Sequence, residues 1–306
     1  MGSPVRATVG RLPVAPGVYR FRDARGRALY IGRATALRHR VGSYWTDLGD
    51  RRHLARMVPQ IVRVEALVCD SVHEAAWLER NLLERSRPRW NRVAGGAEEA
   101  MCIRVEHRDG VPRLVTVHWP VTETAETFGP YLGGNRTRLA VSALDRVLPL
   151  WATDDRLAGS ARDLARVRGV EVADRGRFLE TVTAVLCRRP DAVLTVRDLL
   201  VRQRDRAATN LAFEHAARIQ SEIEAIDWIV AEQKVTHLTA RPDTEAYGWH
   251  DGLLVGFRFR AGRLCDWTQR ACGPRAARPY LDRTPPALAE FARRNADLGR
   301  SLTDAI

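Results

Sequence analysis

The sequence contains almost no lysine, no long apolar run and no regularly spaced cysteines. Lys234 is the single lysine among 49 basic residues, so arginine carries nearly all of the positive charge. No stretch is apolar and long enough to span a membrane, and the amino-terminal residues MGSPVRATVGRLPVAPG lack the apolar core of a secretion signal. These absences predict a cytoplasmic protein with no membrane partner.

Five cysteines are scattered in an odd number and without C-x-x-C spacing: Cys69, Cys102, Cys187, Cys265 and Cys272. This pattern predicts a reduced protein without structural disulfides. A zinc site built on His250, Cys265 and Cys272 is disfavoured, because a fourth ligand and the usual ligand spacing are missing.

Positive charge is in excess, and most of it lies at one end of the chain. The 306 residues suffice for about two domains, and the net charge is +12. Residues 1–95 contain 18 arginines against 8 acidic residues, which is +10 of that total. Charge gathered on one segment predicts an anionic partner, with nucleic acid as the first candidate. Genome base composition is an alternative explanation of the arginine bias.

Residues 17–45, GVYRFRDARGRALYIGRATALRHRVGSYW, contain a predicted β-hairpin. Two alternating runs, 17–23 and 27–34, flank the turn sequence Asp-Ala-Arg-Gly. Pairing Arg22 with Arg27 across this turn places Tyr19 opposite Tyr30, with both phenols on one face of the sheet. Such a pair is either ordinary packing or part of a functional site.

The next segments alternate between helix and strand. Helical spacing predicts helices at about 36–45 and 53–62, and residues 62–70, VRVEALVCD, predict a third strand. Ser71 and Glu74 form a capping-box pattern at the start of a further helix that Pro88 closes.

Glu79 interrupts the apolar stripe that Ala75, Leu78 and Leu82 form on this last helix. A carboxylate beside an apolar face is costly unless a charged group meets it. Two readings follow: Glu79 pairs with a nearby arginine at the edge of the stripe, or it ligates a divalent metal ion.

The order of these residues resembles the GIY-YIG nuclease motif, in the version found in the amino-terminal half of UvrC. Gly17-x-Tyr19 and Tyr30-x-Gly32 are followed by Arg40 in LRHRVGSYW, Glu79 in EAAWLERNLLERSRP and Asn91 in RPRWN. The match runs through about residues 14–92. It implies a three-stranded antiparallel sheet with flanking helices, on which Tyr19, Tyr30, Arg40 and Glu79 converge.

The resemblance also implies roles for these residues. Glu79 holds one divalent ion, Mg²⁺ or Mn²⁺, while Arg40 stabilises charge on the phosphate. Tyr30 is the general base, with its pKa lowered by Arg33, Arg40 and the metal, and Tyr19 orients water or phosphate. Asn91 completes the predicted catalytic residues, and the predicted substrate-binding residues are Gly32, Arg33, Arg38 and Tyr44.

Two positions depart from the family pattern. Arg33 stands where a lysine is usual, and Ala36 where a polar residue is usual. Because arginine does not donate a proton as readily as lysine, the departures predict a slower enzyme rather than an inactive one.

Residues beyond 95 resemble further parts of UvrC. A linker at 94–99 precedes strand-like residues 101–119 with a turn at Asp109-Gly110, and then FGPYLGG and a helix. In UvrC the next segment carries four cysteines that hold an iron–sulfur cluster. Only Cys187 lies in this region, so no cluster is expected.

Residues 205–233 form a long amphipathic helical pattern containing LAFEHAARIQSEI. The pattern fits an interior helix, or it resembles the UVR helical hairpin through which UvrC binds UvrB. Gln220-Ser221 replaces the usual Arg-Asp pair of that motif. A β-hairpin around Ala261-Gly262 follows, and its Arg258 and Arg260 either contact phosphate or are simply solvated.

We therefore expect an α+β protein with four regions: a GIY-YIG domain at 1–95, a middle region without iron–sulfur cysteines at 96–204, a UVR-like hairpin at 205–235, and a β-hairpin with a helix at 236–306. We expect this chain to lack the second nuclease domain and the helix-hairpin-helix module of full-length UvrC. This shortened architecture resembles the Cho branch of the family, which belongs to the SOS response.

The expected function is a metal-dependent endonuclease of nucleotide excision repair, acting in the nucleoid. It would cut damaged double-stranded DNA on the 3′ side of a lesion, with UvrB as a possible partner through residues 205–235. The alternatives are a non-catalytic DNA- or UvrB-binding accessory protein and a free-standing nuclease such as a restriction enzyme.

Overall fold

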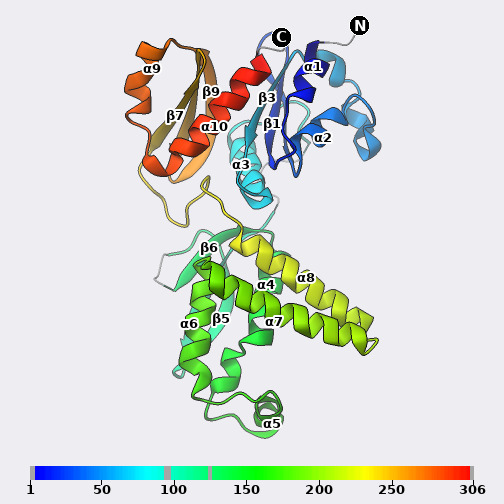
Figure 1. Ribbon diagram of the computed structural model, residues 1–306, viewed down its shortest axis with the longest axis vertical. Coiled ribbons are helices and arrows are strands. Elements are labelled where there is room, and N and C mark those ends of the chain that lie inside the picture. The colour runs from blue at the N-terminus through cyan, green and yellow to red at the C-terminus, as the bar shows by residue number, and fades with distance from the viewer. Residues whose placement is uncertain (1–3, 93–97, 123–125, 304–306) are drawn as a thin grey trace. The chain divides into compact units, whose positions relative to one another are not determined.

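The computed structural model describes residues 4–92, 98–122 and 126–303, which form two compact units (Figure 1). Unit 1 combines both ends of the chain, residues 1–97 and 232–306, and unit 2 is the continuous stretch 98–231. The predicted linker at 94–99 lies outside the described residues except for Glu98 and Glu99, which are exposed.

Unit 1 contains the expected three-stranded antiparallel sheet. Its strands are β1 (Gly17–Arg22), β2 (Ala28–Ala34) and β3 (Arg63–Val68), in the order β2-β1-β3. The predicted β1–β2 register is wrong by two residues: Tyr19 lies opposite Gly32, and Tyr30 lies opposite Phe21. A shift of two leaves both phenols on the same face, as the alternation of a strand requires.

Asp23 accounts for the difference in register. Its backbone N–H donates to the Arg27 carbonyl at 3.0 Å, and its carboxylate accepts the backbone N–H groups of Arg25 and Arg27, each at 2.9 Å. The turn therefore closes between Asp23 and Arg27, and a bulge follows at Phe21/Arg22. A side chain that bonds the backbone two residues further on sets turn length in a way that strand alternation does not reveal.

Three helices accompany this sheet: α1 (Pro4–Gly10), α2 (Leu37–Gly42) and α3 (Val72–Arg85). α2 is shorter than the predicted 36–45. The predicted helix at 53–62 is wrong, because this stretch forms two 3₁₀ turns, η1 (Gly49–Leu54) and η2 (Val58–Gln60). Pro59 explains the change, since a proline disfavours α-helical backbone at the residue before it.

The capping of α3 is confirmed. The Ser71 hydroxyl accepts the Glu74 N–H at 2.9 Å. Glu74 does not return the bond to Ser71; its carboxylate accepts the backbone N–H groups of Asp70 at 2.5 Å and of Lys234 at 2.6 Å. Ala75, Leu78 and Leu82 are buried as expected. The start of α3 is thus tied to the point where the chain re-enters unit 1.

The carboxy-terminal part of unit 1 is a second antiparallel sheet with two helices. Its strands β7 (Thr244–His250), β8 (Leu253–Arg260) and β9 (Arg263–Ala271) are followed by α9 (Pro274–Leu281) and α10 (Pro286–Thr303). The turn at Ala261-Gly262 is confirmed, with positive φ angles of 47° and 77°. The helix α10 crosses β7 so closely that a Cβ at Gly248 would lie 1.9 Å from the Ala292 carbonyl oxygen.

This second sheet and α10 pack directly on the first sheet. The Asn295 amide accepts the Val68 N–H at 2.7 Å and donates to the Val68 carbonyl at 3.1 Å, so it completes the ladder at the free edge of β3. Leu298 and Leu302 join the core beneath β1 and β2. Residues 236–306, which the sequence divides from the amino-terminal domain, therefore share one core with it.

Arg20 makes hydrogen bonds and ion pairs between the two sheets of unit 1. It is 6% exposed, bonds Glu65 at 2.8 Å and the Trp267 carbonyl at 3.0 Å, and approaches Asp266 at 3.3 Å. Its guanidinium lies 3.8 Å above the centre of the Trp267 ring. A charged strand residue is thus enclosed between the two sheets.

Unit 2 packs helices against a third antiparallel sheet, of order β5-β4-β6. Its strands are β4 (Ala100–Arg108), β5 (Val111–His118) and β6 (Thr127–Leu132). The helices are α4 (Gly134–Val147), α5 (Gly159–Val167), α6 (Asp174–Leu186), α7 (Pro190–Thr209) and α8 (Phe213–Val230), with a 3₁₀ turn, η3, at Leu150–Thr153. The Asp109-Gly110 turn between β4 and β5 is confirmed.

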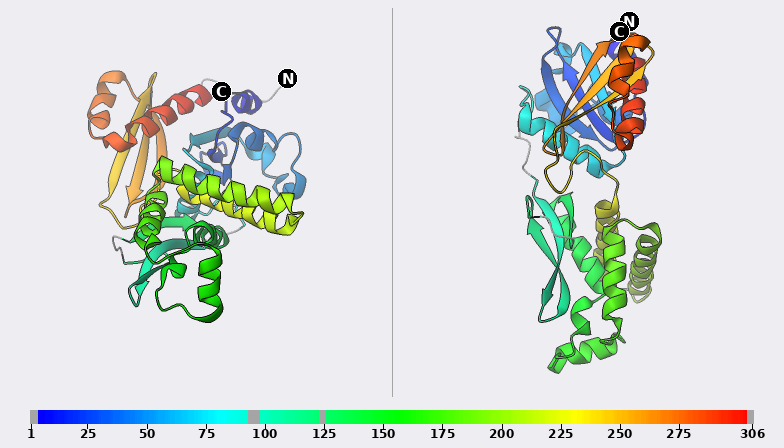
Figure 2. Two further views of the ribbon diagram at one scale, coloured as in Figure 1. Left: turned by 60° about the horizontal axis from the view of Figure 1, so that its bottom comes forward. Right: turned by 90° about the vertical axis from the view of Figure 1, so that its left-hand side faces the viewer.

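Of the two readings for residues 205–233, the helical hairpin is the one observed, although its first arm begins at Pro190 and the chain reverses at residues 210–212. Leu211 adopts a positive φ of 59°, and α7 and α8 then run back along one another as a helical hairpin (Figure 2). Across the described residues, no helix has the length and apolar character needed to cross a membrane.

Candidate active site

Three phenols and one guanidinium gather on one face of the β1–β2 hairpin. Tyr19 comes from β1, Tyr30 from β2, Tyr44 from the turn after α2, and Arg40 from α2 itself. The Tyr19 and Tyr44 hydroxyls are 2.8 Å apart and hydrogen-bonded, and the ring centres of Tyr19 and Tyr30 are 6.2 Å apart. Tyr19 and Tyr44 are buried, whereas Tyr30 is half-buried and Arg40 is exposed. The expectation that these residues come together is therefore met.

Gly32 leaves the room that the phenols occupy. A Cβ at this position would lie 2.5 Å from the Tyr19 hydroxyl oxygen and 2.7 Å from Cε1 of Tyr30. Both distances are shorter than non-bonded atoms allow. The glycine of Tyr30-x-Gly32 is therefore needed for space rather than for an unusual backbone angle.

The protein groups around Tyr30 favour its neutral form. Burial raises the pKa of Tyr30 well above its ordinary value of 10.0, the neighbouring Tyr44 and Glu79 raise it further, and Arg40 only partly offsets this. Burial and Tyr44 raise the pKa of Tyr19 in the same way. Arg40 acts in the predicted direction and lowers the pKa of Tyr30, but burial of the phenol outweighs this one exposed guanidinium.

Arg40 stays positively charged in these surroundings. Burial by itself would lower its pKa, but the phenols of Tyr19, Tyr44 and Tyr30 more than offset this, and Arg40 is hydrogen-bonded to Tyr19. An exposed guanidinium that is held by a buried phenol is suited to receive a phosphate.

Glu79 projects from α3 toward β2. One carboxylate oxygen accepts the backbone N–H of Arg33 at 3.1 Å, and the other lies 3.3 Å from Nε of the same arginine. Its side chain is 22% exposed. Both sequence interpretations stay compatible with this geometry, since Glu79 makes the expected ion pair and still presents oxygen to solvent.

The donor set fits a hard divalent ion better than a transition metal. Glu79 offers carboxylate oxygens beside the hydroxyl of Tyr30, and Mg²⁺ is commonly held by one or two carboxylates while it keeps several waters. No group of three or more His, Cys, Asp or Glu side chains within the described ranges is arranged to enclose a metal. Glu79 is thus the residue that would hold such an ion.

The side chains of Asn91 and Arg38 bond to backbone groups. The Asn91 amide accepts the Ile31 N–H at 3.0 Å and donates to the Ile31 carbonyl at 2.8 Å. It thereby fixes the edge of β2 between Tyr30 and Gly32. Arg38 donates to the Leu12 carbonyl at 2.6 Å. Among the residues predicted for catalysis and substrate binding, these two are engaged with backbone.

Phe21 is a site neighbour that the sequence interpretation missed. Its ring centre lies 4.9 Å from that of Tyr44 and 5.2 Å from that of Tyr19. Its position two residues after Tyr19 on the same strand was the available signal, because alternate residues share a face.

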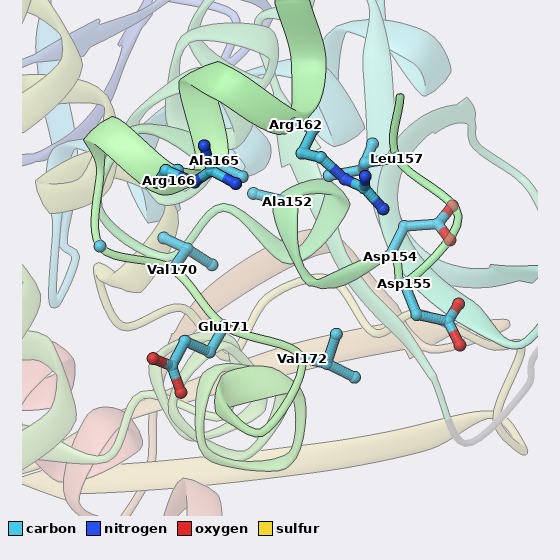
Figure 3. A pocket seen from close by; sticks show the side chains of 11 residues that line it. Ala152, Asp154, Asp155, Leu157, Arg162, Ala165, Arg166, Val170, Glu171 and Val172 are labelled. Carbon is cyan, nitrogen blue, oxygen red and sulfur yellow. The ribbon is translucent and has the colours of Figure 1, made fainter. Parts of the chain in front are cut away.

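Unit 2 has a separate hollow of about 460 Å³ beside η3 and α5 (Figure 3). Asp154, Asp155, Arg162, Arg166 and Glu171 contribute its charged groups, and apolar side chains such as Val170 and Val172 line the rest. No residue of the predicted site and no cysteine lines it.

Comparison with known proteins agrees with this geometry. A family model described as the UvrC-like GIY-YIG domain matches residues 15–92. UvrABC system protein C of Geobacter metallireducens is 30% identical over 272 residues, covering 85% of this chain and 44% of the relative. The same protein of Desulforudis audaxviator is 32% identical over 271 residues, covering 84% of this chain and 43% of the relative.

A solved structure of the GIY-YIG N-terminal endonuclease domain of Thermotoga maritima UvrC, bound to magnesium, is 32% identical; it covers 30% of this chain and 99% of its own, with a TM-score of 0.27. The chain spans less than half the length of the curated relatives named above. On the strength of the matched domain and of these relatives, the chain belongs to the UvrC family.

Proposed function

We propose that this chain is a metal-dependent DNA endonuclease that hydrolyses a phosphodiester on the 3′ side of a lesion during nucleotide excision repair. The observation that carries the proposal is the convergence of Tyr19, Tyr30, Arg40 and Glu79 from four different elements around β1 and β2. A phenol, a guanidinium and a partly exposed carboxylate supply the groups that phosphodiester hydrolysis needs.

Each residue then has a distinct task. Glu79 would hold one Mg²⁺ or Mn²⁺ ion, which when bound polarises the phosphate and stabilises the leaving oxygen. Arg40 donates hydrogen bonds to the phosphate oxygens. Tyr30 is the general base we assign, and Tyr44 is hydrogen-bonded to its hydroxyl. Tyr19 orients water or phosphate. Because the pKa of Tyr30 is raised, activity should increase from neutral toward alkaline pH.

The decisive experiment compares two glutamates of α3 on a lesion-bearing duplex. Incision is measured with Mg²⁺ or Mn²⁺, with and without UvrB, for the native protein, Glu79→Gln and Glu84→Gln. Glu84 makes ordinary ion pairs with Arg80 at 3.1 Å and Arg263 at 2.7 Å. We expect Glu79→Gln to reduce the single-turnover rate by about 10²-fold or more. Glu84→Gln should cut at nearly the native rate, and equal loss in both variants would remove the role of Glu79.

The tip of the α7–α8 hairpin is the surface we propose for UvrB. Leu211 and Phe213 are 74% and 64% exposed there. Large apolar side chains so exposed at a turn are a common feature of docking sites. Phe213→Ser should abolish the stimulation of incision by UvrB and leave the basal rate unchanged. Leu194→Ser is the control, because Leu194 is 58% exposed on α7 away from the tip.

We also propose that the chain needs no iron–sulfur cluster. Cys187 is the single cysteine between residues 103 and 264, and it is exposed. One thiolate cannot replace the four that such a cluster uses. Purified protein with full activity should contain no stoichiometric iron, and a cluster absorbance lost together with activity would contradict this.

One observation favours the second candidate, a non-catalytic DNA-binding protein. Glu79 is already engaged by both the backbone and the side chain of Arg33, where the family usually has lysine. This ion pair competes with a metal ion for the same carboxylate. If native protein and Glu79→Gln bind the duplex equally and neither cuts it, the binding role replaces the nuclease.

A further inference from the structure

Two arginines contact the ring of one tyrosine in the carboxy-terminal part of unit 1, and two more lie on the same helix as that tyrosine. The arginine side chains of Arg270, from β9, and Arg283, just after α9, lie 4.7 Å and 5.1 Å from the centre of the Tyr280 ring. The Tyr247 ring packs edge-on against Tyr280, with the centres 5.0 Å apart. We call these residues, together with Arg275 and Arg278 of α9, the arginine–tyrosine cluster.

These arginines carry charge that the protein does not neutralise. Arg270, Arg275, Arg278 and Arg283 are all exposed. In the part of the chain that the structure describes, none of the four has a carboxylate within 4.0 Å, whereas the nearby Arg258 lies 3.9 Å from Glu245. The acidic groups around the cluster are Asp282, which is exposed, Glu245, which also bonds Tyr247, and Asp266, which approaches the buried Arg20.

Unpaired like charges held close together repel one another, so the arrangement is unfavourable until an anion arrives. The Tyr280 ring restrains two of the guanidiniums by cation–π contact. Restrained guanidiniums lose less conformational freedom on binding, and each can form two parallel hydrogen bonds to a phosphate. The surface is therefore preorganised for a partner with several phosphates.

We propose that the arginine–tyrosine cluster is a second contact site for the DNA sugar–phosphate backbone, separate from the site of cleavage. The proposal rests on the proposed function, because it assumes that DNA is the substrate. Several unpaired guanidiniums with aromatic rings between them are typical of sequence-independent nucleic-acid surfaces. An acidic protein surface would satisfy the charges but would make no use of the two half-buried tyrosine rings.

The position of the cluster determines its role. Within unit 1, α9 lies on the far side of the second sheet from α2 (Figure 1), and it contributes no residue to the phenol cluster. Contacts made there therefore affect how tightly the substrate is held rather than how fast the bond breaks. Because phosphate contacts release counterions, they also make affinity depend on salt.

The test compares two triple variants with the same loss of charge. Arg275→Gln/Arg278→Gln/Arg283→Gln removes three of the four arginines of the cluster, and Arg162→Gln/Arg166→Gln/Arg189→Gln removes three exposed arginines of unit 2. Dissociation constants for a lesion-bearing duplex are measured between 50 and 200 mM salt, with thermal unfolding as a check of folding. We expect the first variant to bind about 10-fold more weakly, with a slope of log Kd against log salt reduced by about 2 to 3. The second should bind within about 2-fold of native protein.

Tyr280→Leu provides a milder variant, which keeps all charges but frees two guanidiniums. Its affinity should fall by a smaller factor, without a change in the salt slope. Single-turnover incision at saturating DNA should be unchanged in every variant. Measuring binding and incision separately distinguishes the two proposals. If native protein binds the duplex but does not cut it, the nuclease proposal fails, while the binding measurements still test the arginine–tyrosine cluster.

Three results would overturn the cluster's assignment. Equal affinity in the cluster variant and native protein would mean that the arginines are only solvated or serve an acidic protein. Equal weakening in both triple variants would reduce the effect to overall charge. The assignment would also be overturned if native protein had no measurable affinity for the duplex.

Discussion

At the scale of single residues, Gly32 controls how closely the two phenols of the site approach β2. We predict that Gly32→Ala destabilises the protein by about 1–3 kcal/mol and reduces incision, because buried Tyr19 cannot retreat from the new methyl group. Chemical denaturation and single-turnover assays measure the two effects. Gly10→Ala is the control, since nothing lies within 4 Å of a Cβ there. Similar losses in both variants would argue against the steric explanation.

The sequence predicted which residues lie near one another better than it predicted their contacts. The spacing of the glycines and tyrosines, with Arg40 and Glu79 after them, was enough to expect one cluster. The register of β1 and β2 was not predictable from alternation, because the side chain of Asp23 sets the length of the turn. Nor did the sequence reveal that Asn91 bonds the backbone of Ile31, since residue type alone does not say which way an amide points.

At the scale of elements, the start of α3 contains a buried acid that should make stability depend on pH. Burial raises the pKa of Glu74 to about 7, compared with 4.5 in an unfolded chain. The folded state therefore binds the proton more tightly, so the stability from this group is present below about pH 4.5 and is lost as pH rises through about 7. Glu74→Gln should remove this part of the pH dependence.

The measurement is the difference in thermal stability between native protein and Glu74→Gln at pH 5 and pH 8. Asp70, which bonds Lys234 and Arg294, has a lowered pKa, and its contribution is lost only at more acidic pH. Asp145 also titrates in the chosen window, with a pKa raised by burial to about 6, but it does so equally in both proteins. A constant difference between the two proteins would show that Glu74 stays ionised on folding.

Elements with strong local signals were predictable, and those decided by tertiary contacts were not. The capping pattern at Ser71 and the turns at Asp109-Gly110 and Ala261-Gly262 were all confirmed. The helix predicted at 53–62 failed although Leu54 and Met57 are buried, because helical spacing of apolar residues also fits successive 3₁₀ turns. The reversal at Leu211 lacks the glycine that usually marks a turn with positive φ.

At the scale of the whole molecule, Arg20 joins parts of unit 1 that lie 246 residues apart. We predict that Arg20→Ala costs about 2–3 kcal/mol, because Glu65 loses the bond from Arg20 while it keeps Arg22 at 2.8 Å, and the Trp267 ring loses its cation–π contact. Arg27→Ala in the β1–β2 turn is the matched control. Its ion pair with Asp23 is exposed on the arginine side, so its loss should cost far less than the loss of Arg20.

Urea denaturation gives both free energies of unfolding, and a difference below the error of the fits would refute the role of Arg20. The burial of Arg20 was beyond sequence-based reasoning. In the strand sequence GVYRFR it alternates with Tyr19 and Phe21 as a solvent-facing residue does, and its partners belong to a region that the sequence divides from the first domain.

The interleaved layout of unit 1 has a consequence for synthesis on the ribosome. Val68 is translated 227 residues before Asn295, the residue that completes its ladder. At usual translation rates of roughly 5–20 residues per second, about 10–45 s pass between the synthesis of Val68 and that of Asn295. During this time the edge of β3 lacks its hydrogen-bond partner, and the Arg20–Glu65 pair is exposed to solvent. Unit 2 emerges complete during that interval. Newly made chains should therefore depend on chaperones, and pair wrongly with one another, mainly through β3.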